Sequence, residues 1–384
     1  MVECDISVPK TWAKGFERRM PPSEYFAEMS PIFCTTEVGF EHLSPEMKNY
    51  VVRGGLSRNS RRLLVGGMKA EKILLATPLL QWYLQHGLQI TKIYLVMEYV
   101  PNACFRDFQQ EVSDARRRGD ADPTLSIIAD TMKLLGNSAY GSMIMDKEKH
   151  KSVIYVKGEV NGKMKVNQRN FQSLTELGGE MYEIEMAKKT INLNLPITLG
   201  YFILQYAKLR MLQFYYDCID RYLHRGDYEY IEMDTDSAYL GLSGDNLRDV
   251  IRPELKDEFD KKIMQSCAVN KFFASDDHWF PRECCEKHIK HDKRTPGLFK
   301  LEASGKEMIA LNSKTYLLQQ ENDFKMSCKG INKLSVENPL KIFHNCLFDK
   351  QTAGGSNRGF RARENTIFSY TQEKRGFGYF YSKR

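Results

Sequence analysis

The chain has 384 residues, of which 42% are hydrophobic and 27% charged, and its formal net charge is +7. This share of apolar side chains can bury a sizeable core, which excludes a mainly disordered chain. No apolar stretch reaches the ~20 residues that a membrane span needs, and the acidic start shows no secretory signal, so we expect no membrane partner. Nine cysteines without such a signal predict reduced thiols in an intracellular protein. A nuclear location is compatible with the sequence, although no signal for it can be read.

Positive charge gathers at the C-terminal end. Between Arg358 and Arg384, seven basic residues stand against two glutamates, so this stretch carries five of the seven net positive charges. Seven aromatic residues are interleaved with them, and we expect these to form a small core beneath the basic side chains. Such a composition is typical of a surface that binds the phosphates of nucleic acids. A solvated basic terminus without a partner is the alternative.

The first hundred residues predict strands on either side of one helix. Residues 2–9 alternate as a strand does, and a domain rarely starts in the middle of a sheet. We therefore expect the sequence to be a fragment of a longer chain. An apolar helix is predicted at residues 72–86, and a strand rich in β-branched and aromatic residues at 92–99.

A pair of helices follows. Residues 103–118 carry apolar side chains at helical spacing and are followed by Gly119, which predicts the end of the first helix. Asp122 is a suitable N-cap with Pro123 at the first helical position, so a second helix should run to about Tyr140. Two helices with so short a connection form an αα-hairpin.

The second half mixes short strands with one long helix. Residues 153–156 and 160–166 predict a β-hairpin with Asn161-Gly162 at its turn, and residues 196–222 predict a helix. Its buried side should carry Phe202, Tyr206, Leu209 and Phe214. Further strands are expected on both sides of an acidic turn within 230–242, and at 298–303 and 315–318. The fold class predicted from this pattern is α+β, a sheet carrying acids with helices on one face.

The acidic turn is the first candidate site. Alternation along the strand would place Asp234 and Asp236 on one face, where two carboxylates repel each other unless a cation lies between them. Carboxylate oxygens favour Mg²⁺ or Mn²⁺. An ordinary hairpin turn stabilised by aspartate and serine is the alternative.

A second candidate site lies on the second helix of the predicted pair. At ~100° per residue, Lys133, Asn137 and Tyr140 share one face of that helix. Lys133 could there bind a triphosphate while Tyr140 packs on a base or sugar. Taken alone, the alternative is a solvated lysine, a core tyrosine, and a helix that ends at Gly141.

Together the two segments resemble the family B DNA polymerases. Residues 133–141 match the motif K-x₃-N-S-x-Y-G at every specified position, and residues 230–242 contain the motif D-T-D-S. The two motifs follow each other in the same order and at similar spacing as in that family. Residues 313–316, Ser-Lys-Thr-Tyr, are similar to the K-x-Y motif, and Lys329-Gly330 follow it as is usual in the family. The finer similarity is to the protein-primed branch, in particular polymerases of Polinton or Maverick transposons and related viruses.

The resemblance implies a right-hand polymerase architecture and a role for each motif residue. Residues 1–100 would be the remainder of the palm with an insertion, 101–142 the two-helix fingers, 143–310 the palm with the D-T-D-S hairpin, and 311–384 the thumb and basic tail. The implied roles are as follows: catalysis and metal binding by Asp234 and Asp236; nucleotide binding by Lys133, Asn137 and Tyr140; DNA binding by Ser138, Gly141, Thr235, Lys314, Tyr316 and Lys329.

The resemblance also implies the reaction and its partners. Nucleotides would be added to a primer 3′ end with Mg²⁺ or Mn²⁺ as cofactor, and the partners would be primer-template DNA, deoxynucleoside triphosphates and a priming protein. Arg116, Arg117 and Arg118 would contact template or triphosphate, with a solvated helix end as the alternative.

One departure from the family pattern concerns the first catalytic aspartate. It belongs to a D-x₂-S-L-Y-P segment upstream of the fingers, and no Leu-Tyr-Pro occurs in this sequence. Asp5 is the only acid in a vaguely similar strand. A chain without this aspartate should bind primed DNA but extend it very poorly. The alternative function is therefore a non-catalytic nucleic-acid-binding remnant, and a basic structural protein with coincidental motifs is a third hypothesis.

Two further clusters do not fit known motifs. Cys284, Cys285, His288 and His291 are zinc-type ligands, but adjacent cysteines and H-x₂-H differ from the usual C-x₂₋₄-C pairing, so the sequence gives little support for a zinc site. The paired glycines at 54–55 and 66–67 lack the rest of a P-loop.

Overall fold

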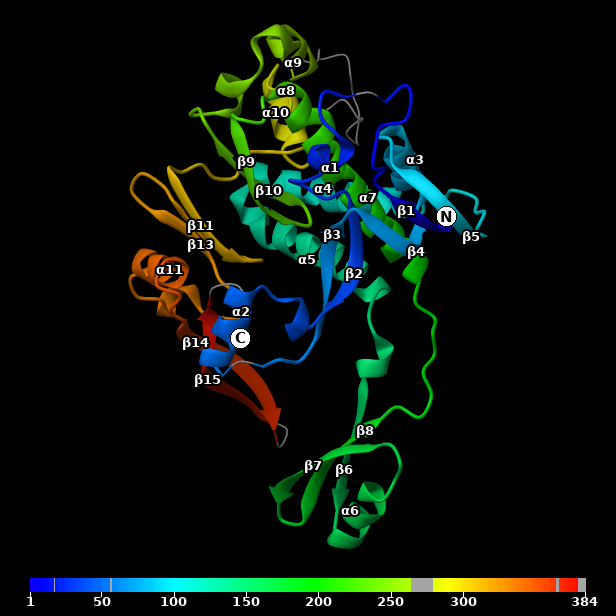
Figure 1. The fold of residues 1–384 in the computed structure, drawn as a ribbon. Coiled ribbons are helices and arrows are strands. Elements are labelled where there is room, and N and C mark those ends of the chain that lie inside the picture. The colour runs from blue at the N-terminus through cyan, green and yellow to red at the C-terminus, as the bar shows by residue number, and fades with distance from the viewer. Residues whose placement is uncertain (17, 56, 264–278, 364–365, 379–384) are drawn as a thin grey trace.

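The computed structural model describes residues 1–16, 18–55, 57–263, 279–363 and 366–378. Helices and strands are interspersed along this part of the chain, which confirms the α+β class. Figure 1 shows a main body, a C-terminal unit and an arm that points away from both. The arm consists of β6 (Lys151–Lys157), α6 (Glu159–Val166), β7 (Phe171–Gly178) and β8 (Met181–Ala187).

The N-terminal sheet has β1 (Val2–Ser7) in its centre, with β4 (Lys69–Leu75) and β5 (Gln89–Val96) antiparallel on its two sides. The strand expected at 2–9 is thus confirmed over Val2–Ser7, and the one expected at 92–99 forms three residues earlier than predicted. The helix expected at 72–86 is wrong in its first part, because residues up to Leu75 belong to β4. Helix α3 (Thr77–Gln85) begins after them, with Pro78 in its first turn. Pairing with β1 satisfies the backbone N–H and C=O groups of β4, and this outweighs the local preference of these residues for a helix.

The predicted αα-hairpin is confirmed. It consists of α4 (Arg106–Ala121), a 3₁₀ turn η2 (Pro123–Leu125) and α5 (Ser126–Met143). Asp122 acts as the expected N-cap, because its Oδ1 accepts a hydrogen bond from the Thr124 amide at 2.9 Å.

Both helices run beyond their predicted ends. Helix α4 continues past Gly119 to Ala121, so this glycine does not end it. A Cβ at Gly119 would lie only 2.4 Å from the Cβ of Ala129 on α5, so the glycine lets the two helices approach closely. Helix α5 likewise continues through Gly141.

The β-hairpin predicted at 153–166 is wrong. Gly158 has a φ of 86° and ends β6, and the next residues form α6. Strand β6 pairs instead with β8. The first turn of α6 is stabilised locally, because Asn161 Nδ2 donates to the Lys157 carbonyl and Glu159 forms an ion pair with Lys163 at 2.7 Å.

The long helix predicted at 196–222 is confirmed in extent. It consists of α7 (Ile197–Gln213), a π-helical segment η4 (Phe214–Ile219) and α8 (Asp220–Tyr222). Leu209 and Phe214 are buried as predicted, but Tyr206 is 54% exposed. The neighbouring Gln205 is buried instead and accepts a hydrogen bond from the Ala76 amide.

The acidic hairpin follows, with β9 (Tyr228–Asp234) antiparallel to β10 (Ser237–Leu242), as predicted. The strand expected at 298–303 does not form. The C-terminal unit contains the sheet β11 (Glu307–Asn312), β12 (Thr315–Gln319) and β13 (Phe324–Ser327), then α11 (Pro339–Leu347) and the hairpin of β14 (Ala353–Arg363) and β15 (Thr366–Phe377). The strand predicted at 315–318 is thus confirmed. The other elements of the body are α1 (Pro22–Tyr25), β2 (Ile32–Val38), α2 (Pro45–Arg53), β3 (Arg61–Gly67), α9 (Lys256–Ile263) and α10 (Glu286–Asp292).

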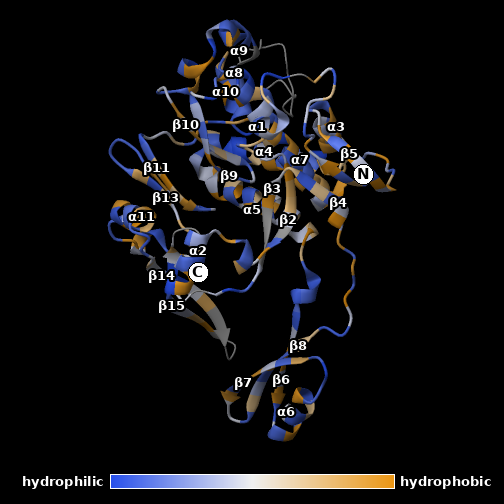
Figure 2. Cartoon of the chain, viewed as in Figure 1, coloured by the Kyte–Doolittle hydropathy of each residue, from blue (hydrophilic) through white to orange (hydrophobic). Residues whose placement is uncertain are grey.

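Within the described residues, buried apolar side chains form two hydrophobic cores. The larger one joins the N-terminal sheet, α3 and the long helix, and extends to Trp279. The smaller one starts at Ile309 in β11 and ends at Phe377 in β15, so the C-terminal unit has a core of its own. Figure 2 shows polar and apolar residues mixed along the helices. Among the described residues, no helix is long and apolar enough to cross a membrane.

Candidate nucleotide and DNA site

The D-T-D-S segment forms a tight turn at the end of β9. The Asp236 amide donates to the Asp234 carbonyl, which closes a three-residue turn around Thr235. Thr235 has a φ of 44°. Positive φ is uncommon for a β-branched residue and costs of the order of 1–3 kcal/mol, and such strain is found preferentially at functional sites.

This turn changes the predicted relation of the two aspartates. Strand β9 ends at Asp234, so alternation along a strand does not extend to Asp236, and the prediction of a shared pleat face is wrong. The turn itself brings the two residues into one exposed tip. Asp234 has 29% of its side chain exposed, and Asp236 is exposed.

The K-x-Y segment packs against this hairpin. Lys314 lies in the turn between β11 and β12, with a φ of 64°, and its Nζ is 3.3 Å from Oδ1 of Asp234. Two residues further on, the rings of Tyr316 and Tyr239 lie with centroids 4.8 Å apart, and the Tyr239 hydroxyl donates to that of Tyr316 at 3.0 Å. Burial raises the pKa of Tyr316, and this hydrogen bond raises it further. Motifs about 80 residues apart in the sequence are thus brought together.

Glu232 is a third acid at this place, which the motif comparison did not single out. It lies two residues before Asp234 in β9 and accepts a hydrogen bond from the Lys314 amide at 2.8 Å through Oε1. Its Oε2 is buried and has no hydrogen-bond partner among the described residues. Burial raises the pKa of Glu232; the bond from Lys314 lowers it in part, and the charge of Asp234 raises it further. In the sequence, Glu232 could have been recognised from its position two residues before Asp234, the spacing at which side chains share one face of a strand.

The second candidate site lies on the fingers-like hairpin. Lys133, Asn137 and Tyr140 share a face of α5, as predicted; the first two are exposed and Tyr140 is half-buried. Lys133 lines a cleft of about 150 Å³. The residues around it are Arg116, Gly119, Asp120, Ser126, Ala129, Asp130, Lys133 and Arg294.

Three cationic side chains and the two aspartates Asp120 and Asp130 surround this cleft, so it carries a small net positive charge. Burial and the neighbouring charge of Arg294 lower the pKa of Arg116. Arg294 itself is held by Asp120 through two bonds of 2.7 and 2.5 Å. Arg294, which comes from the loop after α10, was not expected at this place. The pair with Asp120 raises the pKa of Arg294, so Arg294 stays charged beside Arg116 and Lys133. Neighbouring cations of this kind provide a favourable environment for an anion.

The other residues with predicted roles are distributed as follows. Ser138 and Gly141 lie exposed on α5. Lys329 is exposed in the turn after β13, beside Gly330. Arg117 and Arg118 are engaged within the protein, because Arg117 pairs with Asp114 and Arg118 with Glu111. Of the three consecutive arginines, only Arg116 lines the cleft.

Asp5 is half-buried and is held by residues on the two neighbouring strands of the N-terminal sheet. Its Oδ1 accepts a hydrogen bond from the Lys72 amide at 2.7 Å, and its Oδ2 one from the Tyr94 hydroxyl at 3.0 Å. Among the described residues, no group of three acids has oxygen atoms close enough together to share a metal ion. Asp5 therefore does not complete the site at Asp234 and Asp236.

The basic tail forms the hairpin of β14 and β15, and its aromatic residues are only partly buried. Phe377 lies fully in the smaller core, whereas Phe360 is 77% and Phe368 49% exposed. The expectation that these aromatic side chains form a core beneath the basic ones is therefore wrong for Phe360 and Phe368. The side chains of Arg361 and Arg363, and residues 379–384, lie outside the described part of the chain.

No protein-family model matches the chain, and searches of curated proteins and of solved structures find no match either. The resemblance to family B polymerases therefore remains a prediction, which depends on the motifs and on the geometry above.

Proposed function

We propose that the chain is the catalytic core of a template-directed DNA polymerase, which adds deoxynucleotides to a primer 3′ end. The observation that carries the proposal is the contact between Lys314 and Asp234, reinforced by the pair of Tyr316 and Tyr239. In a polymerase, the acids that bind metal must lie beside the residues that hold the primer end, because the 3′-hydroxyl reacts between them. The right-hand architecture, with α4 and α5 as fingers and residues from 311 as thumb, is part of this proposal.

The acidic turn suits a hard divalent cation. Asp234 and Asp236 offer carboxylate oxygens, which Mg²⁺ and Mn²⁺ prefer, and the unpartnered Oε2 of Glu232 adds a buried acceptor nearby. A bound cation there would lower the pKa of the primer hydroxyl and offset charge on the leaving pyrophosphate. Lys314 already neutralises Asp234, so it occupies part of the space that a cation would use.

The cleft on the fingers suits the triphosphate. Lys133 is exposed and can meet the β- and γ-phosphates, and Arg116 and Arg294 add positive charge around it. These groups would hold the nucleotide and stabilise charge that develops during transfer. Asn137 and Tyr140, one and two turns along the same face, would lie against the nascent base pair. A priming protein is a further proposed partner.

A second function is favoured by one specific observation. Among the described residues, no third acid joins Asp234 and Asp236 closely enough to form a three-ligand metal site. A non-catalytic remnant that still binds nucleic acid would have this geometry. It would keep the surface charge and lose the chemistry.

Binding and extension measured together separate the two functions. Fluorescence anisotropy should give tighter binding to primer-template DNA than to blunt duplex, and a labelled primer should be extended with Mg²⁺ or Mn²⁺ according to the template. Binding with the same preference but without extension would establish the remnant. Equal affinity for all DNA forms, without extension, would refute both.

A further inference from the structure

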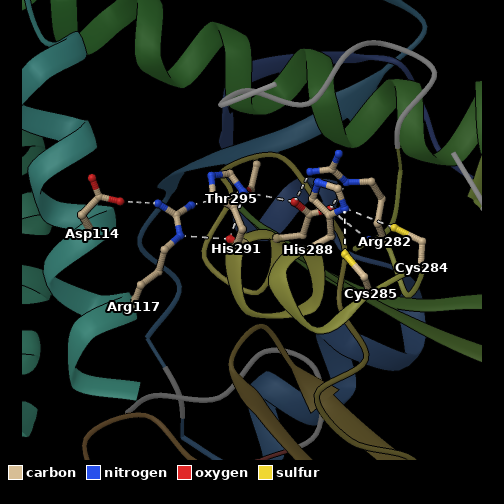
Figure 3. Close-up of polar contacts among 9 residues, drawn as sticks. Asp114, Arg117, Arg282, Cys284, Cys285, His288, His291 and Thr295 are labelled. Carbon is tan, nitrogen blue, oxygen red and sulfur yellow. Dashed lines mark hydrogen bonds and ion pairs between the residues drawn. The ribbon is translucent and has the colours of Figure 1, made fainter. Parts of the chain in front are cut away.

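Three zinc-type side chains converge at the start of α10. His288 is buried, and its Nδ1 lies 3.2 Å from Sγ of Cys284 and 3.3 Å from Sγ of Cys285. All three ligand atoms lie within 4.8 Å of one another. Figure 3 shows both sulfur atoms directed at the His288 ring. The uncommon spacing of adjacent cysteines gave little support for a metal site in the sequence, but the backbone brings the ligand atoms together.

We propose that Cys284, Cys285 and His288 bind one Zn²⁺ ion. Two thiolates and one imidazole are a ligand set that Zn²⁺ favours over hard cations such as Mg²⁺. Tetrahedral bonds of about 2.3 Å to sulfur and 2.0–2.1 Å to nitrogen put N and S about 3.6 Å apart. The observed separations need to open by only a few tenths of an ångström, which small side-chain rotations supply. The fourth position belongs to a ligand outside this cluster.

The segment is fixed by a buried ion pair. The guanidinium of Arg282 donates to both oxygens of Asp292, through Nε at 2.7 Å and Nη2 at 2.8 Å, and its amide donates at 3.0 Å. Both side chains are 1% exposed. Arg282 precedes the cysteines and Asp292 ends α10, so this pair encloses the three ligands in one closed loop. Ligands held in this way are arranged before a metal binds.

His291 is not part of the site. Its Nδ1 faces Oδ1 of Asp292 at 3.2 Å, and its carbonyl accepts a hydrogen bond from Nε of Arg117 on α4 at 3.0 Å. This difference within one short helix supplies a matched control.

The site would support the fingers-like hairpin. The loop that carries the three ligands continues directly into Arg294 and Thr295. Arg294 binds Asp120 of α4, and the Thr295 hydroxyl lies 3.4 Å from Nη2 of Arg117. Figure 3 shows Arg117 of α4 in contact with His291 and Thr295, which follow the three ligands in the chain. Zinc would therefore fix the element on which the end of α4 rests. This structural role is independent of the proposed polymerase activity.

The test is metal stoichiometry in the full chain. After chelation and reloading with zinc sulfate, elemental analysis should find one Zn²⁺ per chain. The Co²⁺-substituted chain should show the intense charge-transfer absorption of thiolate ligands. Cys285→Ser and His288→Gln should weaken binding by more than the ~10–100-fold typical of changes around a ligand. His291→Gln and the exposed Cys104→Ser should bind as the unchanged chain does.

Several results would overturn the site. These are absence of zinc binding at micromolar free zinc, equal binding by His288→Gln, or a Co²⁺ spectrum without thiolate bands. The Co²⁺ spectrum needs no variant, so it decides the question even where a substitution prevents folding.

Discussion

Lys314 and Asp234 form an ion pair of 3.3 Å between two turns that both contain a residue with positive φ, Lys314 itself and Thr235. Each turn is unfavourable on its own, and the two are held against each other by the Lys314 amide on Glu232. The pair thus links the acidic hairpin of the body to the C-terminal unit. Any cation or primer end that binds at Asp234 must share this place with the Lys314 ammonium group.

Replacing Lys314 should affect the primer end selectively. Lys314→Ala should weaken binding of a recessed primer terminus by about 10–100-fold, which corresponds to one charge-assisted hydrogen bond, and change blunt duplex little. Lys314→Arg keeps the charge and should retain most of the affinity. Fluorescence anisotropy on both DNA forms is the measurement. An equal loss on both forms would assign Lys314 to general phosphate binding.

Lys133 should contribute to nucleotide affinity. Lys133→Ala removes the exposed cation of the cleft, so the Kd for a deoxynucleoside triphosphate should rise about 10–100-fold, as for one charged hydrogen bond of about 1.5–3 kcal/mol. Isothermal titration calorimetry at low salt measures it. Lys163→Ala on the arm is the matched control, because that lysine is paired with Glu159. An unchanged Kd for Lys133→Ala would remove the cleft from the nucleotide site.

The basic hairpin should contribute to the salt dependence of DNA binding. Phe377 is buried in the smaller core, so deleting the tail would disrupt folding, and neutralising Arg358, Lys374 and Arg375 together is the cleaner change. The slope of log K against log salt should become shallower by about 0.9 for each phosphate contact removed. Neutralising Lys188 and Lys189 of the loop after β8 is the control. An identical slope in both variants would show that the hairpin does not contact DNA.

Asp292 should make stability depend on pH. Burial alone would raise its pKa, but hydrogen bonds from Arg282 outweigh this and lower the pKa to about 2. A carboxyl with a lowered folded-state pKa stabilises the fold above its ordinary pKa, and this contribution is lost as the pH falls from about 4 toward 2. Asp292→Asn should therefore lower the free energy of unfolding by about 3–5 kcal/mol near neutral pH, as expected when one partner of a buried ion pair is removed. Near pH 2 the loss should be much smaller.

Denaturant unfolding at several pH values checks this, with the exposed Asp257→Asn as control. A cost that is independent of pH would mean that Asp292 is not charged in the folded chain.

The sequence predicted best where local rules and tertiary contacts agree. Asp122 caps its helix as a local rule requires, and the two strands around Asp234 follow from apolar alternation. The motif pattern also predicted a shared face for Lys133 and Asn137, because helical geometry alone determines it.

The sequence was a poor guide to segments whose structure is determined by partners distant along the chain. Residues from Lys72 to Leu75 have a helical pattern but pair with β1, and Gly158 ends a strand where a hairpin was expected. Arg294 in the cleft and the Lys314 contact depend on tertiary packing that no local pattern encodes. The sequence identified Cys284 and His288 as zinc-type ligands but gave the cluster little support, because motif spacing is a poor guide when an irregular backbone positions the ligands.

Incorporation of a single nucleotide tests the central claim most directly. With primer-template DNA, Mn²⁺ and excess chain, the account predicts slow addition of the nucleotide that matches the template, abolished by Asp236→Asn and unaffected by Asp245→Asn, an equal charge change in the exposed loop after β10. Slow rather than fast addition is expected, because the described residues bring only two motif aspartates to the turn. Addition that is indifferent to the template or persists in Asp236→Asn, or no addition at all by a chain that still binds the primer, would contradict the account.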